Sequence, residues 1–581
     1  MVSEEYPYVS IKTVDTLIHP CSDSVKLVPC VGLPLGHFAL RCFSRKYLFA
    51  LICFTSLFFG LAWCSTWFGW LLFVSIIPLL LIVQHCIRFG KRASFIDCFP
   101  YLFFALFLWN VLTIWWLSKA AFAAFFFVAF FNTSCLLVPW YVYYHMRKRA
   151  GMYVGYIALV ASWLTLEYVH LAWESWELTF PWLNLGNGLA GLHAWIQWYC
   201  FTGILGGSLW ILVVNLLLYH WLAEAAKSSL SCFALVLFPL GLSLGMYYTH
   251  TENGTLVEAV VVQPNFDSYT EKAYGSPHFV PVSKQIERLL DLTHRHLTPN
   301  TSLVLWPESA VDCWLEEACI PNYLVVQPII QFLEAHPNIS LILGVSSFQQ
   351  YGAIKRTKTA KKRKEHYVDY FNSVFHMRKS HNLNLDIYHK TKRLPGAEYI
   401  PYFHLFSTKM LQWIRQKFAE IGEIDPCLAQ GNGSKVFVTE RGVQIAPINC
   451  YESLYGAFVG SACQKGATLF AVVTNDGWWG NTPIYQHHFK YSQVLAVSHR
   501  RSLMRAANTG ISGCINQRGD VLAATNRLKP TAVRQLVCTN DRVTFYSIHG
   551  DYIGQVAFWV FLFLLCVLLA KNIPKPFAVR Q

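Results

Sequence analysis

Long apolar runs alternate with short basic clusters through the N-terminal part of the chain, and one further run lies near its C-terminus. A helix needs roughly 20 apolar residues to cross a hydrocarbon core of about 30 Å. Eight runs come close to that length and are predicted to span a membrane: 47–64, 66–87, 99–117, 120–144, 151–173, 198–222, 230–248 and 553–570. The pattern predicts a polytopic α-helical membrane protein with eight transmembrane helices, the first seven forming a membrane domain at 47–248.

Basic residues between these runs predict the orientation of the helices, because short cytoplasmic loops are enriched in Lys and Arg. They lie before the first run and after the second, fourth, sixth and eighth: Arg41, Arg45, Lys46, Arg88, Lys91, Arg92, Arg147, Lys148, Arg149, Lys227, Lys571 and Lys575. The opposite loops hold only Lys119, and 174–197 has no Lys or Arg. The tails 1–46 and 571–581 are therefore predicted in the cytoplasm, and the insert 249–552 outside.

The insert has a different pattern, in which strand-like runs alternate with helix-like segments such as 281–296 and 485–503. The strand-like runs are LVEAVVVQPN, SLVLWPES, SLILGVSS, GVQIAPINCYES and ATLFAVVTND. Such alternation is typical of an α/β domain, and runs that are apolar throughout suit strands covered on both faces. Residues that carry function are then expected in the loops just past the strand ends.

Composition agrees with a membrane protein and argues against nucleic-acid binding. Of the 581 residues 54% are hydrophobic and 14% are charged, whereas soluble proteins average roughly 25% charged residues. Much of the net charge of +14 lies in the clusters that flank apolar runs, so it is interpreted as a topology signal. The 18 cysteines form no recognisable disulfide framework, and the pairing of Cys313 with Cys319 stays open. The basic stretch 353–364 is interpreted either as a solvated loop or as a site of attraction to anionic headgroups.

Three reactive side chains lie at or just after strand-like runs of the insert: Glu308 in LVLWPES, Lys390 in DIYHKTKRLPGAEYIP and Cys450 in APINCYESLYG. Each alone has an ordinary interpretation, as a solvated loop residue or as a buried packing cysteine. Together they form a chemical set, because a thiol with a pKa of about 8.5 needs a nearby base or cation to act as a nucleophile. A carboxylate can take its proton, and a lysine ammonium can stabilise the oxyanion that forms on an acyl carbon.

The order of these residues, with the contexts WPES, YHK…PGAE and NCYE, resembles the nitrilase superfamily. Set between predicted membrane helices, the insert resembles the catalytic domain of the apolipoprotein N-acyltransferase family. The motifs FPWLNLG at 180–186, VTNDGWWG at 473–480 and RAANTGIS at 505–512 add to this resemblance. The resemblance implies an αββα sandwich for 249–552.

The resemblance also implies roles for individual residues. It makes Glu308 the general base, Lys390 the stabiliser of the transition state and Cys450 the nucleophile. Supporting roles in the active site fall to the residues that match further family positions: Glu398, Tyr451 and Glu452. Candidates for a lid at the substrate entrance are three aromatic residues: Trp478, Trp479 and Tyr274, the last near a position where the family carries a tryptophan.

The implied reaction is the last step of lipoprotein maturation in the bacterial inner membrane, with the catalytic domain in the periplasm. Cys450 takes the sn-1 acyl chain of a phospholipid such as phosphatidylethanolamine and passes it to the α-amino group of a diacylglyceryl-apolipoprotein. This chemistry needs no metal or diffusible cofactor, and a monomer surrounded by membrane lipids is expected. Two alternatives stay open: a membrane-tethered amidase of the nitrilase type that acts on a soluble amide, and a transporter or receptor. The second predicts polar residues inside the spans, which are few.

Overall fold

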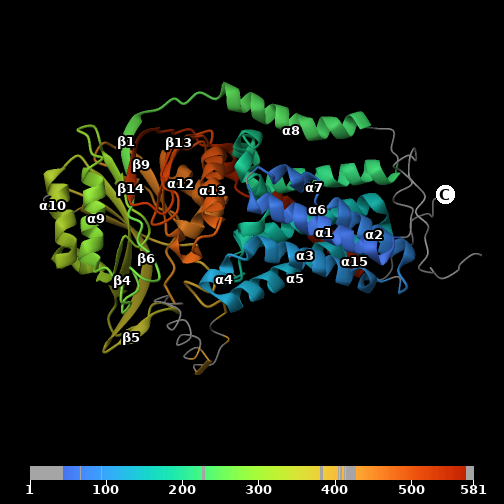
Figure 1. The fold of residues 1–581 in the computed structure, drawn as a ribbon, viewed down its shortest axis with the longest axis horizontal. Coiled ribbons are helices and arrows are strands. Elements are labelled where there is room, and N and C mark those ends of the chain that lie inside the picture. Colours follow the sequence, from blue (N-terminus) through green and yellow to red (C-terminus); the bar gives the residue numbers. More distant parts are fainter. Residues whose placement is uncertain are drawn as a thin grey trace, which may run out of the picture.

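The computed structural model describes residues 43–570, apart from 66, 93, 174–175, 225–228, 380–383 and, within 403–426, all but 405, 409, 410 and 413. Along the longest axis of the molecule an α/β domain lies at one end and a bundle of long helices at the other (Figure 1). Most of the predicted N-terminal tail and the whole C-terminal tail 571–581 lie outside the described residues.

The bundle contains a helix at each of the eight predicted spans. Its main helices are α1 (Arg45–Cys64), α2 (Ile77–Phe89), α3 (Phe99–Ile114), α5 (Phe122–Ala150), α6 (Met152–Ala172), α7 (Tyr199–Glu224), α8 (Ser229–Thr249) and α15 (Tyr552–Leu569). Within the described residues, six helical segments are long and apolar enough to cross a membrane: 45–64, 69–89, 122–150, 152–172, 199–222 and 552–569. These segments establish a multi-pass membrane protein. The length and composition of the helices do not by themselves confirm the predicted count of eight spans.

Two predicted spans fall short of that criterion for different reasons. α3 has only 16 residues, because the chain turns at Trp115 and Trp116 into the short helix α4 (Leu117–Ala120). In α8 the described apolar stretch is 236–249. The fourth span is longer than predicted, since the basic residues at 147–149 continue α5 until Gly151, whose φ of 89° ends the helix.

The α/β domain contains two sheets. The first has the order β14-β1-β2-β4-β6-β5, with β3 on β4 and β7 on β6, and the second has the order β13-β12-β11-β10-β9-β8. The strands of the first sheet are β1 (Leu256–Gln263), β2 (Leu303–Leu305), β3 (Val311–Glu316), β4 (Ser340–Gln350), β5 (Lys361–Arg363), β6 (His366–Arg378), β7 (Asn384–His389) and β14 (Thr531–Cys538). Those of the second are β8 (Phe437–Val438), β9 (Gln444–Asn449), β10 (Leu469–Thr474), β11 (Leu503–Ala507), β12 (Gly513–Ile515) and β13 (Val521–Ala524).

The two sheets pack face to face and are covered by helices on their outer faces, which is the expected αββα sandwich (Figure 1). One buried cluster joins the inner faces, with Val261 and Ile342 from the first sheet beside Val473 and Met504 from the second. Helices α9 (Val282–His294) and α10 (Gln327–Ala335) cover the first sheet, and α12 (Gly456–Gln464) and α13 (Ile484–His499) cover the second. Each fully buried aliphatic side chain contributes about 1.5–3 kcal/mol to this packing.

All five strand-like runs of the sequence are strands, namely β1, β2, β4, β9 and β10. The predicted helix 281–296 is α9, but the predicted helix 485–503 ends earlier, at His499. The helix stops there because Arg500 adopts a left-handed conformation, with φ 51°, and the chain then enters β11.

The loop between α6 and α7 fixes the α/β domain on the bundle. The hydroxyl of Tyr491 on α13 donates a hydrogen bond to the carbonyl of Trp182, 3.0 Å away. The buried guanidinium of Arg500 donates to the side-chain oxygen of Gln197 at 2.5 Å and to its carbonyl at 3.0 Å. Trp182 and Tyr491 belong to one cluster of buried residues, which also includes Tyr451 of the α/β domain and residues of the bundle helices. The two parts therefore share one core at their junction.

Candidate active site

Cys450 lies at a sharp turn where β9 passes into a short 3₁₀ helix, Cys450–Leu454. Its φ of 52° is left-handed, which is unusual for a residue with a side chain and is tolerated where the surroundings enforce it. The hydroxyl of Thr474, at the end of the neighbouring strand β10, donates a hydrogen bond to its Sγ at 3.3 Å. The residue remains partly exposed. The turn thus presents the thiol at the carboxyl ends of two parallel strands.

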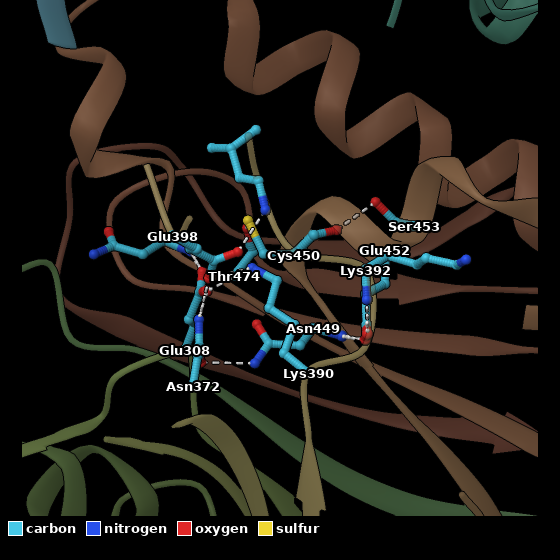
Figure 2. Close-up of polar contacts among 12 residues, drawn as sticks. Glu308, Asn372, Lys390, Lys392, Glu398, Asn449, Cys450, Glu452, Ser453 and Thr474 are labelled. Atoms are coloured by element: carbon cyan, nitrogen blue, oxygen red, sulfur yellow. Dashed lines mark hydrogen bonds and ion pairs between the residues drawn. The ribbon is translucent and has the colours of Figure 1, made fainter. Parts of the chain in front are cut away.

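Glu308, Lys390 and Glu398 form a buried ion-pair set beside the thiol (Figure 2). The Lys390 Nζ lies 2.9 Å from Glu398 Oε1 and 3.4 Å from Glu308 Oε1. The side chains of Glu308 and Lys390 are 9% and 3% exposed. The ordinary interpretation of these two residues as solvated loop residues is therefore wrong. The three predicted catalytic residues come together, although 142 positions separate the first from the last in the sequence.

The charges around the thiol determine its resting state. The protein surroundings withhold hydration from the Cys450 thiol and raise its pKa, and the Glu308 carboxylate raises it further while Lys390 opposes the rise. Burial favours the neutral amine of Lys390, but the carboxylates of Glu398 and Glu308 raise the pKa of Lys390 well above its usual value. At neutral pH the site therefore holds a protonated thiol and an ammonium, so attack by sulfur needs a base.

Glu452, which directly follows Tyr451, ties the turn at Cys450 to the segment that carries Lys390. One carboxylate oxygen accepts hydrogen bonds from the Tyr388 hydroxyl at 2.6 Å and from the backbone N–H groups of Thr391 and Lys392 at 2.7 and 3.1 Å. The other oxygen accepts from the backbone N–H of Asn449 at 2.8 Å. Burial raises the pKa of the Glu452 carboxyl, while these donors oppose the rise. These bonds join the turn at Cys450 to the segment that carries Lys390.

Sequence reasoning missed three asparagines that organise the acidic groups. The Asn372 amide donates to Oε1 of both Glu308 and Glu398, at 2.7 and 2.8 Å, and accepts from the side chain of Asn449 at 2.8 Å. The backbone N–H of Asn475 donates to Glu308 Oε2 at 2.9 Å. Asn372 could have been noticed as an amide inside the apolar run YFNSVF of β6.

A buried chain of polar side chains supports the turn at Cys450. The Ser453 hydroxyl donates to the carbonyl of Cys450 at 2.7 Å and lies 3.3 Å from His488 Nε2. On its other side His488 lies 2.8 Å from the Asp476 carboxylate, which also pairs with Arg505. Burial disfavours ionisation of Asp476, but the charges of Arg505 and His488 outweigh it and lower its pKa to about 2. This chain helps to enforce the unusual φ of Cys450.

The other predicted site residues take different positions. The Tyr451 hydroxyl donates to the carbonyl of Thr179 in the membrane domain, 3.1 Å away. The Trp479 ring packs edge-on against Trp116, with centroids 4.7 Å apart, whereas Trp478 packs against Tyr269 at 5.4 Å.

Tyr274 lies apart from these aromatic contacts. It is 78% exposed and packs on Phe279. Its place at a substrate entrance stays a prediction. Cys313 and Cys319, whose pairing was open, are free thiols.

Curated relatives align over most of the chain. The apolipoprotein N-acyltransferase of Chlorobaculum tepidum is 24% identical over 501 residues, which are 84% of this chain and 89% of the relative. That of Pseudomonas aeruginosa is 27% identical over 433 residues, or 72% of this chain and 74% of the relative. Among solved structures, a Nesterenkonia amidase of the nitrilase superfamily matches 52% of this chain and 98% of its own, with 12% identity and a TM-score of 0.34.

Two family models match successive parts of the chain. The α/β domain matches the model described as carbon-nitrogen hydrolase over residues 274–539. The protein is thus a membrane-bound enzyme whose α/β domain is of the carbon-nitrogen hydrolase type. The bundle matches the model described as the apolipoprotein N-acyltransferase N-terminal domain over residues 55–217. With both models and these relatives, the chain belongs to the apolipoprotein N-acyltransferase family and is an acyltransferase.

Proposed function

We propose that the protein transfers the sn-1 acyl chain of a membrane phospholipid to the α-amino group of the diacylglyceryl-cysteine at the N-terminus of a lipoprotein. One contact carries this proposal: Tyr451, the residue after the nucleophile, binds the carbonyl of Thr179 in the membrane domain. A thiol beside membrane helices suits two substrates that are both anchored in lipid. The name shared by the relatives supports the acceptor. We take phosphatidylethanolamine as the donor and the monomer as the working unit.

In the first half-reaction, Cys450 Sγ attacks the ester carbonyl carbon while Glu308 takes the thiol proton. The negative charge that develops on the carbonyl oxygen is stabilised by the ammonium of Lys390, which Glu398 keeps charged. When the tetrahedral intermediate collapses, the bond from the acyl carbon to the glycerol oxygen breaks. Glu308 returns its proton to that oxygen, and the products are a lysophospholipid and a thioester on Cys450.

In the second half-reaction, the α-amino group of the acceptor attacks the thioester carbon. Glu308 accepts a proton from the attacking nitrogen, and Lys390 again stabilises the oxyanion. The carbon–sulfur bond breaks, an amide forms, and Cys450 is protonated again.

A soluble amide as the substrate would leave the membrane domain without a role, which disfavours the amidase alternative. Trp478, Trp479 and Tyr274 are proposed as parts of the entrance for both substrates.

We further propose eight transmembrane helices, cytoplasmic tails and a periplasmic catalytic domain, 249–552, in the bacterial inner membrane. The course of α3 supports the count. Phe95, just before α3, packs on Tyr144 near the end of α5, and Trp116, just after α3, packs on Trp479 of the α/β domain. α3 and the turn after it thus run from one end of the bundle to the other. Figure 1 shows α8 beside α7, leading towards β1.

Reporter fusions test this topology. A reporter inserted within 353–364 is expected to show a periplasmic signal, and a reporter at the C-terminus a cytoplasmic one, because an even number of spans puts both tails on one side. A third fusion after Gly151 separates eight spans from six. With eight, four helices precede it and its signal is cytoplasmic, whereas without α3 it becomes periplasmic. A cytoplasmic signal from 353–364 would contradict the whole assignment.

Purified protein tests the reaction itself. Incubation with phosphatidylethanolamine labelled in its sn-1 chain and a diacylated lipopeptide is expected to give a labelled N-acyl lipopeptide and an unlabelled lysophospholipid. Mass spectrometry of the lipopeptide locates the new acyl group on the α-amino nitrogen. Release of ammonia from small amides without any acyl transfer would instead establish an amidase.

A further inference from the structure

A cavity lies on the opposite side of the strands that position Lys390. Its volume is about 980 Å³, and its lining includes Phe371 and His389. These residues directly precede Asn372 and Lys390, and successive side chains of a strand point to opposite faces. The rings of Phe371 and His389 are stacked, with their centroids 3.9 Å apart, and form part of the cavity wall. The cavity is therefore separated from Cys450 by the strands β6 and β7.

The lining of this cavity is strongly basic. Its cationic residues are Lys355, Lys358, Lys361, Lys362 and Arg393, together with His389. Among the lining residues that the structure describes, Glu177 supplies the one carboxylate. His389 is already paired with Glu317, which lies 2.7 Å away. Within the described part of the chain, the ammonium groups at 355, 358 and 362 make neither a hydrogen bond nor an ion pair, so a ligand can bind them.

The basic stretch 353–364 is anchored to the sheet, which sets it apart from a freely solvated loop. The fully buried carboxylate of Asp369 on β6 accepts hydrogen bonds from the hydroxyls of Tyr351, Thr357 and Thr359, at 2.8, 2.6 and 2.8 Å. The end of the stretch forms β5, which pairs antiparallel with β6. A buried carboxylate with three donors fixes a backbone firmly. The lysines are thus held around the cavity.

We propose that this cavity is a second binding site, for a phosphate ester. Several ammonium groups and a guanidinium around one space suit a ligand whose few atoms carry several anionic oxygens, and Arg and Lys are the usual partners of phosphate. The volume of the cavity lies within the range of small-ligand sites, roughly 300–1,000 Å³, and leaves room for a phosphodiester headgroup. The ester can belong to an anionic lipid headgroup or to a soluble molecule. The site does not depend on acyl transfer.

The site is connected to the reaction centre through the backbone. The N–H of Gly431, a lining residue, donates to the carbonyl of Lys390 at 3.0 Å. Arg393 and Tyr399 of the lining flank the turn in which the N–H of Leu394 binds the Glu398 carboxylate at 2.7 Å. Residues of the two segments that hold Lys390 and Glu398 therefore line the same cavity as the lysines.

Calorimetric titration of the full-length protein in a neutral detergent tests the proposal. The probes are glycerol 1-phosphate and the short-chain lipid dihexanoylphosphatidylglycerol. The test variant is Lys355→Gln/Lys358→Gln/Lys362→Gln. The control removes three exposed lysines elsewhere on the same domain: Lys284→Gln/Lys465→Gln/Lys529→Gln. We expect the test variant to bind the probes about tenfold more weakly or worse, and the control to bind like the wild type, because three charges near the ligand are lost.

The pattern of binding identifies the source of the phosphate. Equal affinity for both probes supports a site for the phosphate ester itself, whereas binding of the lipid probe alone supports a headgroup site. The proposal is overturned if neither probe binds, if test and control variants weaken binding equally, or if an acidic peptide binds more tightly than both probes. None of these readouts uses acyl transfer, so a failure of the proposed reaction remains distinguishable from a failure of this site.

Discussion

Replacing Cys450 with serine is expected to abolish the acyl-enzyme and, with it, transfer of an acyl chain to a lipopeptide. A hydroxyl is a much weaker acid than a thiol, and the surroundings of Cys450 already raise the pKa of the thiol above its usual value. An alkoxide is therefore out of reach for the base Glu308. Loss of the nucleophile from a catalytic set costs on the order of 10⁶ in kcat, the largest effect expected in this protein.

Intact-protein mass spectrometry after incubation with phospholipid alone checks this result, since the wild type should gain the mass of one acyl chain. Cys319→Ser is the matched control, because Cys319 is a free, partly exposed cysteine of the same domain. It should acylate like the wild type. A Cys450→Ser protein that N-acylates a lipopeptide at a near-normal rate would show that another residue is the nucleophile.

The parts of the fold with a local signal could be predicted from the sequence. Apolar runs gave the helices of the bundle, and the five strand-like runs gave strands β1, β2, β4, β9 and β10. Glu308 and Cys450 could be proposed as site residues because each lies at or just after a strand-like run, and the structure places both of these strands parallel to a neighbour. The carboxyl ends of such strands are where α/β proteins bind their ligands.

The parts that depend on distant contacts could not be predicted. The hydrogen bond from the Asn475 N–H to Glu308 joins residues 167 positions apart, across the two sheets. Nothing near Ser453 in the sequence indicates that His488 lies behind it. The cavity lined by the basic stretch is likewise a product of packing, because Asp369 fixes the stretch from a neighbouring strand. The end of α3 was missed for a different reason, because it depends on the local turn at Trp115 and Trp116, which lies inside an apolar run.

Glu308→Gln and Lys390→Ala should each remove most of the acyl-enzyme, for different reasons. Glutamine keeps the size of Glu308 but cannot accept the thiol proton, and loss of a general base commonly costs about 10²–10⁴ in rate. Alanine removes the ammonium that stabilises the oxyanion, and loss of such a stabiliser costs about 10²–10³. Pre-steady-state acylation by phospholipid, measured per folded molecule, gives both rates.

If these residues have a purely structural role, their substitution should slow acylation only by destabilising the fold. Removing one partner of a buried ion pair costs about 3–5 kcal/mol of stability, because a charge is left without its counterion. Lys390→Ala leaves Glu308 and Glu398 facing each other without a cation. The double variant Lys390→Ala/Glu398→Gln removes one of these two carboxylate charges.

This double variant should therefore regain thermal stability and yet remain slow in acylation. If acylation recovers together with stability, Lys390 acts through the fold alone. If Glu308→Gln forms acyl-enzyme as fast as the wild type, the thiol proton goes to another base. Slow acylation in a stable double variant, together with slow acylation in Glu308→Gln, would assign the oxyanion to Lys390 and the proton to Glu308.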